Sequence, residues 1–246
     1  MLAGIDVDLD SAAVVYRPAA GEERSVPAKH ADPAALYAGT PWRTFRWYFG
    51  QRHYSGTYWS ATQRDHVIYE SRLELAALML ADFNRRVHGI AAQPFELKAE
   101  VNHKSRRHVL DYLWDTVDGP VVVDVVRRER LTQNKIQVLC SWTRQVVESL
   151  GWSYEVISEP EPIRLANVRF LAGYRREWLI NQPVLSELRS CAPNLAGLPI
   201  GEAESRIVSW PQPLVRSTLM HMMWTQELSA DLDFPLNSST VLEVPS

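Results

Sequence analysis

Residues 106–126, RRHVLDYLWDTVDGPVVVDVV, decide the fold class of this chain. The dipeptide Asp118-Gly119 is typical of a tight turn, and it separates two runs rich in β-branched and aromatic residues. We therefore predict two strands joined at that turn. The second strand, Pro120–Val126, is apolar on both faces apart from Asp124, so it is expected at the centre of a sheet that is covered on each side.

Helical periodicity flanks this strand pair on both sides. Residues 68–87 place Leu73, Ala76, Ala77, Leu80 and Phe83 at spacings of three and four, and residues 132–150 repeat that period before Gly151. Short strands are expected at 95–101, after Pro94, and at 153–157. The order of strands and helices predicts an α/β fold, a mixed sheet with flanking helices on both faces.

The remaining segments are less regular. Residues 1–41 are rich in Ala, Pro and Asp and are expected to form an N-terminal arm with one hairpin. Residues 41–59, PWRTFRWYFGQRHYSGTYW, predict strands that form either a half-buried sheet edge or a surface of aromatic and Arg side chains for nucleic acid. Residues 42–160 are taken as the main domain, closed by Pro160 and Pro162. Beyond it, residues 161–246 predict a small helical or winged-helix region, with helices at 163–176, 184–188 and 213–228 and a strand pair at 236–244.

Composition excludes several classes of protein. The chain has 246 residues, 46% hydrophobic and 22% charged, so it can bury a core and is not disordered. No apolar run is long enough to span a membrane, and the acidic start lacks the features of a signal peptide. The two cysteines, Cys140 and Cys191, suggest neither a disulfide framework nor a zinc site, and we expect a cytoplasmic protein.

The charge distribution leaves room for a local basic surface. The net charge is −3, but residues 42–130 carry 14 basic and 11 acidic side chains and are the net basic part of the chain. Lysine is scarce: Lys29, Lys98, Lys104 and Lys135 stand beside 22 arginines.

Three carboxylates form the candidate site. Asp111 and Asp124 belong to the two strands of the predicted pair, and Glu74 lies on the preceding helix. A carboxylate within VVVDVV is costly unless a cation compensates its charge, and a divalent metal ion does this. The alternatives are structural: Asp124 pointing outward from an edge strand, Asp111 bonding a turn amide, and Glu74 pairing with Arg72 or a neighbouring helix.

The region from Pro41 to Tyr174 resembles the TnsA family, the endonuclease subunits of heteromeric transposases in the PD-(D/E)xK nuclease superfamily. The motifs that carry this resemblance are WRTFRWYFGQRHYSGTYWSAT, YESRLELAALMLADF, AAQPF, HVLDYL and VVVDVVRRERL. The family's catalytic Glu in Ser-x-Leu-Glu corresponds to Glu74, its strand Asp to Asp111, and its third acidic position to Asp124. The resemblance implies a restriction-endonuclease-like fold.

The sequence departs from the family at the motif lysine, which is Val126 here. In this class that lysine helps to orient and deprotonate the attacking water and stabilises charge on phosphorus. Arg127 is expected to face away from Asp124, because side chains alternate along a strand. Lys135 and Lys98 are the candidate replacements, and a metal ion alone also lowers the pKa of bound water.

Further basic residues are candidates for DNA phosphate contacts. Lys104, Arg106 and Arg107 precede Asp111, whereas Arg127, Arg128 and Arg130 follow Asp124. Each could equally be a solvated side chain. Gln93, in AAQPF, is expected to support Glu74 or DNA, or to cap a turn. Four histidines, which we interpret as surface or structural residues, are His53, His66, His103 and His108.

The resemblance also implies a reaction and partners. Such a subunit cuts the 5′ strand at transposon ends by metal-dependent attack of water. The Mg²⁺ or Mn²⁺ ion would be held by Asp111, Asp124 and the Val125 carbonyl, with Glu74 directly or through water. The implied partners are transposon-end DNA, a DDE transposase (TnsB-like) and an AAA+ regulator (TnsC-like). Two alternatives stay open, a catalytically weakened DNA-binding and assembly subunit and a stand-alone restriction or repair nuclease.

Overall fold

The computed structural model describes residues 4–43 and 54–244. By their internal contacts the residues divide into two compact units. The first comprises Met1–Asp82 and Arg86–Glu159, and the second comprises Phe83–Arg85 and Pro160–Ser246. The C-terminal segment of the second unit begins at Pro160, one residue before the start expected at residue 161. The protein is a mixed α/β structure.

A four-stranded sheet in the order β10-β9-β8-β5 forms the centre of the first unit. Its strands are β5 (Val87–Ala92), β8 (Tyr112–Thr116), β9 (Gly119–Val125) and β10 (Ser153–Ile157). The β8–β9 pair turns at the predicted Asp118-Gly119, where Gly119 has a φ of 104° that glycine adopts readily. β9 lies between two neighbours, as its valine run predicts, and β10 joins it in parallel after helix α3 (Asn134–Ser149).

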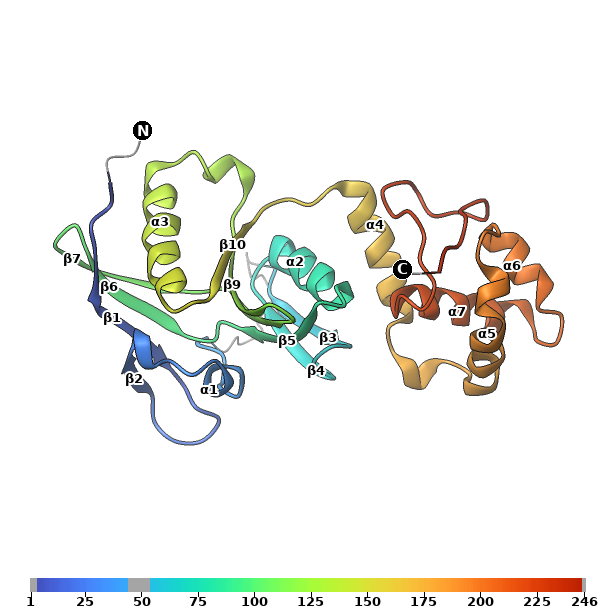
Figure 1. Ribbon diagram of the computed structural model, residues 1–246, viewed down its shortest axis with the longest axis horizontal. Helices are drawn as coiled ribbons and strands as arrows, with labels where there is room; N and C mark the ends of the chain where they lie inside the picture. The colour runs from blue at the N-terminus through green and yellow to red at the C-terminus, as the bar shows by residue number, and fades with distance from the viewer. Residues whose placement is uncertain (1–3, 44–53, 245–246) are drawn as a thin grey trace. The chain divides into compact units, whose positions relative to one another are not determined.

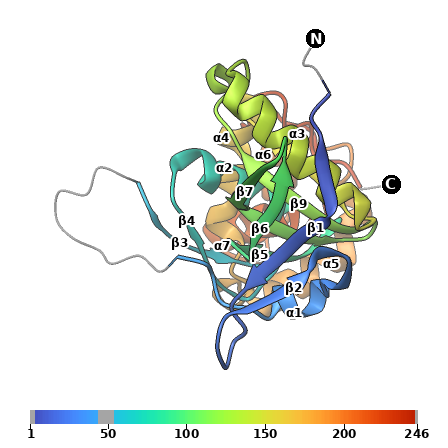
Figure 2. The ribbon, with the colours of Figure 1, turned by 90° about the vertical axis from the view of Figure 1, so that its left-hand side faces the viewer.

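A second sheet in the order β2-β1-β6-β7 corrects two predictions. Its strands are β1 (Val7–Tyr16), β2 (Arg24–Pro27), β6 (Glu96–Val101) and β7 (Lys104–Val109). Residues 106–126 therefore contribute to three strands rather than two, because the β6–β7 hairpin precedes β8. The N-terminal residues form the expected hairpin, β1 with β2, but they belong to this sheet rather than to an arm, since β1 also pairs along β6 (Figure 2).

A small hairpin and one helix complete the fold around the candidate site. β3 (Gly56–Ser60) pairs with β4 (Asp65–Tyr69), and helix α2 (Arg72–Phe83) follows directly. The strands predicted over 41–59 fall largely on residues 44–53, which lie outside the described residues. The remaining helical segments of this unit are short: α1 (Pro33–Tyr37), η1 (Ala28–His30) and η2 (Arg128–Arg130).

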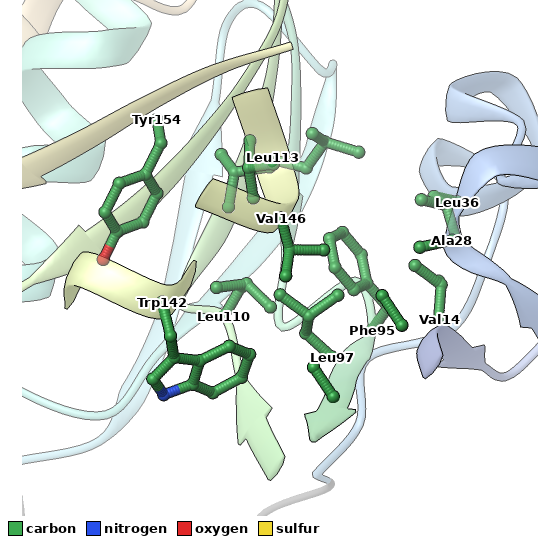
Figure 3. Packing of buried hydrophobic residues seen from close by; sticks show 14 of the residues in the cluster. Val14, Ala28, Leu36, Phe95, Leu97, Leu110, Leu113, Trp142, Val146 and Tyr154 are labelled. Carbon is green, nitrogen blue, oxygen red and sulfur yellow. The ribbon is translucent and has the colours of Figure 1, made fainter. Parts of the chain in front are cut away.

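The core of the first unit lies between α3 and the two sheets. Trp142 and Val146 of α3 pack with Leu113 of β8, Leu97 of β6 and Phe95 (Figure 3). Burial of such side chains is the main stabilising contribution to the fold. The other face of the central sheet carries Tyr112, whose hydroxyl donates to the Glu74 carbonyl of α2 at 3.4 Å. Helices therefore cover both faces, and the strand ends between them hold the candidate site.

The second unit is helical. Its segments are α4 (Pro162–Leu171), η3 (Ala172–Tyr174), η4 (Glu177–Leu179), α5 (Gln182–Leu195), α6 (Ile200–Arg206) and α7 (Gln212–Trp224). The strand pair predicted over 236–244 is not formed in its described part, where residues 241 and 243 make isolated bridges with Pro199 and Ser229. Among the described residues of the whole chain, no helix is both long and apolar enough to cross a bilayer.

Candidate active site

The two candidate aspartates lie opposite each other at the end of the β8–β9 hairpin. The last pair in the register is Tyr112 with Val123, and one further step places Asp111 opposite Asp124. Side chains at opposing positions of antiparallel strands share a face, so the two carboxylates are neighbours. Asp111 Oδ2 accepts a hydrogen bond from the Val125 backbone N–H at 2.7 Å. Asp111 does bond a backbone amide, but one within the strand rather than in a turn.

Asp124 points into the protein rather than outward from an edge strand. It is 2% exposed, and the Tyr154 hydroxyl donates to its Oδ2 at 2.6 Å. Nε2 of His108 lies 2.9 and 2.8 Å from the two carboxylate oxygens. Burial, and next the Asp124 charge, raise the pKa of Tyr154, so this hydroxyl stays a hydrogen-bond donor.

Repulsion between the acids affects the pKa of Asp111. Burial raises the pKa of the Asp111 carboxyl well above its ordinary value, and the charge of Asp124 raises it further. The Val125 hydrogen bond opposes the shift, while the charges of Glu74 and Glu70 add to it. The charges of three other carboxylates thus act on Asp111, and a bound cation would relieve that repulsion.

Two glutamates lie near this region: Glu74 in the first turn of α2, and Glu70 two residues before the helix. Glu74 Oε2 accepts the Glu70 backbone N–H at 2.7 Å, and the Glu74 N–H donates to Ser71 Oγ at 3.1 Å. Burial raises the pKa of Glu74 above its usual range, and its hydrogen bonds oppose that shift. Arg72 does not pair with Glu74, since its guanidinium lies over the Tyr54 ring at 4.6 Å.

A cavity of about 460 Å³ opens beside Asp111. Arg43 and Arg107 are its basic residues, and Glu70 and Glu96 are acidic residues of its wall. The complete lining is Trp42, Arg43, Glu70, Gln93, Glu96, Arg107, His108, Val109 and Asp111. Gln93 belongs to this wall, and its amide Nε2 donates to Glu70 Oε1 at 2.7 Å rather than to Glu74.

The two candidate replacement lysines differ in position. Lys98 Nζ lies 3.6 Å from Glu96, which also interacts with Arg107 at 3.8 Å, so Lys98 reaches the cavity wall. Lys135 is exposed near the start of α3.

The predicted DNA-binding residues form two exposed groups. Lys104, Arg106 and Arg107 lie along β7, an edge strand of its sheet that leads directly to His108 and Asp111. The second group follows β9. Arg127 lies 3.9 Å from Glu129, Arg128 is bonded to Glu159, and Arg130 is exposed in the same short helical turn.

Three residues of the site were not recognised from the sequence. Of the two roles expected for His108, surface or structural, the structure shows the structural one, because its ring contacts Asp124 and packs edge-on against Trp142. His66 and His103 are exposed, and His53 lies outside the described residues. Arg43 and Glu70 lie within two of the quoted motifs, WRTFRWYFGQRHYSGTYWSAT and YESRLELAALMLADF, but neither was singled out as a site residue. The signal available in the sequence was that His108 lies three residues before Asp111. The arrangement of the strands is needed to show that its ring meets Asp124.

The donor atoms present suit a hard divalent cation. Within residues 4–43 and 54–244, no three or more His, Cys, Asp or Glu side chains are arranged to ligate an ion as they stand. Mg²⁺, however, is commonly held by one or two carboxylates with waters and phosphate oxygens. In the described part of the chain Asp111 makes one side-chain hydrogen bond, through Oδ2, so its other oxygen is free to ligate.

Comparison with known proteins adds no identification. No protein-family model matches the chain, and no curated protein matches it. The resemblance to the TnsA family therefore rests on the sequence motifs and their order.

Proposed function

We propose that this protein is a metal-dependent DNA endonuclease, the TnsA-like subunit of a heteromeric transposase that cleaves the 5′ strand at transposon ends. The observation that carries the proposal is the opposition of Asp111 and Asp124 at the strand ends, beside a cavity with basic side chains on its wall. Two carboxylates that repel each other are an expensive arrangement for stability alone.

The order of elements supports a restriction-endonuclease-like fold for this unit. α2 is followed by β5, β8 and β9, and then by α3 and the parallel strand β10, with the β6–β7 hairpin inserted. In such a core the acids of the second and third strands lie side by side under the first helix. That relation matches the positions of Asp111, Asp124 and the start of α2.

The protein's own residues divide the work of phosphodiester hydrolysis. Asp111, Asp124 and the Val125 carbonyl would hold Mg²⁺ or Mn²⁺, together with a carboxylate from the start of α2. The bound ion supplies an activated water and stabilises negative charge on the phosphate. The arginines on the cavity wall and along β7 would contact neighbouring phosphates, which positions DNA without reading its sequence.

Partner binding is assigned to the second unit. Its exposed large apolar side chains include Phe170, Trp178, Leu179, Val208 and Phe234. Exposed apolar groups of this size often belong to protein interfaces. We propose that this unit contacts the DDE transposase and the AAA+ regulator.

One experiment tests the assignment. The protein, its transposase and end-containing DNA are incubated with Mg²⁺ or Mn²⁺, and 5′-strand nicks are mapped. Asp111→Ala is expected to abolish the nicks, whereas Asp115→Ala, at an exposed aspartate of the following strand β8, leaves them unchanged. Nicks that persist in Asp111→Ala remove the site assignment.

The alternative functions are separated by the same assay. Val126, in place of the motif lysine, favours a catalytically weakened subunit whose role is DNA binding and assembly. Assembly on DNA without nicks from the native protein would establish that alternative. Nicks formed without the transposase would instead indicate a stand-alone nuclease.

A further inference from the structure

Glu70 is held in the cavity by two neighbouring side chains. Its Oε1 accepts the Gln93 amide at 2.7 Å, and Nη1 of Arg43 lies 3.3 Å from each of its oxygens. Glu70 lines the same cavity as Asp111. An ionised carboxylate has about four acceptor positions, so these contacts fix its orientation and still leave it able to ligate a cation.

Gln93 connects Glu70 to the strand that carries Asp111. Its backbone N–H donates to the Asp111 carbonyl at 2.8 Å, and its carbonyl accepts the Trp42 N–H at 2.9 Å. Its side-chain oxygen accepts the Arg43 N–H at 3.0 Å. Gln93 is 5% exposed and has a φ of 45°, a conformation that persists in a non-glycine residue when its surroundings determine it. The spacing of Glu70 from Asp111 is therefore set by one rigid residue.

Glu74 has a different task. Ser71 Oγ accepts the Glu74 N–H while the Glu74 carboxylate accepts the Glu70 N–H, a reciprocal arrangement that resembles a capping box. The sequence Ser71-x-x-Glu74 is the pattern that such a cap requires. Among the described residues, the wall of the cavity includes Glu70 and not Glu74.

We propose that Glu70 supplies the α2-side carboxylate of the divalent-cation site, with Gln93 as its positioning residue, and that Glu74 caps the helix. This inference rests on the proposed metal-dependent function. It reassigns the acid that the Ser-x-Leu-Glu motif indicates to the glutamate four residues earlier.

Two neighbouring Glu→Gln substitutions form a matched test. Glu70→Gln retains an oxygen that can accept from Gln93 and Arg43, and Glu74→Gln retains one that can cap the helix, so each removes a charge and spares the hydrogen bonds. Mn²⁺ affinity of the full chain is measured by calorimetry and by the loss of the free-ion paramagnetic resonance signal. Glu70→Gln is expected to weaken Mn²⁺ binding at least tenfold, and Glu74→Gln less than threefold.

The role of Gln93 is tested by comparing its effect on Mn²⁺ binding in two backgrounds, rather than by measuring nuclease activity. Gln93→Ala is expected to weaken Mn²⁺ binding in the native background and to cause no further loss in the Glu70→Gln background, because it acts through Glu70. Equal losses in both backgrounds would show a merely structural role. Thermal unfolding verifies that each variant is folded. If Glu70→Gln does not fold, Glu70→Asp, which keeps the charge but shortens the reach, is expected to show the same tenfold loss.

The outcomes separate this inference from the proposed function. If the native protein binds Mn²⁺ and Glu70→Gln binds it equally well, the inference is wrong while the proposed function stands. A loss in Glu74→Gln that equals or exceeds that in Glu70→Gln also overturns it. If the native protein binds no Mn²⁺, the metal-dependent function fails, and this inference with it.

Discussion

Asp82 and Asp111 are acidic residues of the same unit in opposite circumstances. Asp82, at the end of α2, is 7% exposed and accepts four hydrogen bonds: from Tyr58 and Ser60 hydroxyls and the Ala61 and Thr62 amides. Asp111 accepts one hydrogen bond within the described residues and lies opposite a second carboxylate. A fully bonded buried acid stabilises its surroundings, whereas an under-bonded acid beside another is poised to bind a cation.

The comparison predicts that Asp82→Ala has the largest effect on stability. The substitution leaves four donors near the β3–β4 hairpin without their acceptor, and loss of such a network costs roughly 3 kcal/mol. Urea unfolding measures the change in free energy. A loss below about 1 kcal/mol would mean that water replaces the carboxylate easily and that Asp82 is no structural counterpart to Asp111.

Asp111→Asn is expected to raise the free energy of unfolding, whereas Asp82→Ala lowers it. Because the folded pKa of Asp111 is raised, the folded protein binds this proton more tightly than the unfolded chain, and that stability is lost as pH rises through the folded pKa. The neutral amide should therefore stabilise the metal-free protein at pH 7 by on the order of 1 to 2 kcal/mol.

Acidification and added metal ion are the controls for Asp111→Asn. The gain should shrink as pH falls toward the unfolded carboxyl pKa of about 4. Mg²⁺ should raise the melting temperature of the native protein and not of the variant. A variant that is less stable than the native protein at pH 7 would contradict the repulsion inferred between the two aspartates.

Val126→Lys tests whether the site lacks a cation at the end of β9. Val126 is partly exposed two residues after Asp124, so a lysine there falls on the same face of the strand. We expect about tenfold faster nicking, because a fixed cation stabilises the developing phosphate charge. An unchanged rate in the nicking assay would mean that another cation, such as Lys98 or Arg43, already fills this role.

Ser71→Ala is expected to have the smallest effect. It removes the side-chain acceptor at the start of α2 and should cost about 1 kcal/mol of unfolding free energy. Thermal unfolding measures the loss. Mn²⁺ affinity should change little, and a large drop in affinity would show that the cap and the cation site are coupled.

Local patterns predicted much of the fold of the first unit. The period of three to four around Leu73 and Leu80 predicted α2, and Asp118-Gly119 predicted the β8–β9 turn, because these signals depend on residues adjacent in sequence. The boundary between the β6–β7 hairpin and β8 was missed. Residues 106–116 contain no glycine or proline to mark it, and the chain changes sheets there through long-range pairing.

By itself the sequence determined that one aspartate lies within the VVVDVV strand and that a second aspartate precedes it across a turn. Only the tertiary structure decided which other side chains meet these acids. His108 reaches Asp124, and Gln93 holds Glu70 in the cavity beside Asp111, through contacts between residues 16 and 23 positions apart. Periodicity encodes which face a side chain occupies, but the partner across a cavity is set by how sheets and helices pack, and that packing is a property of the whole folded unit.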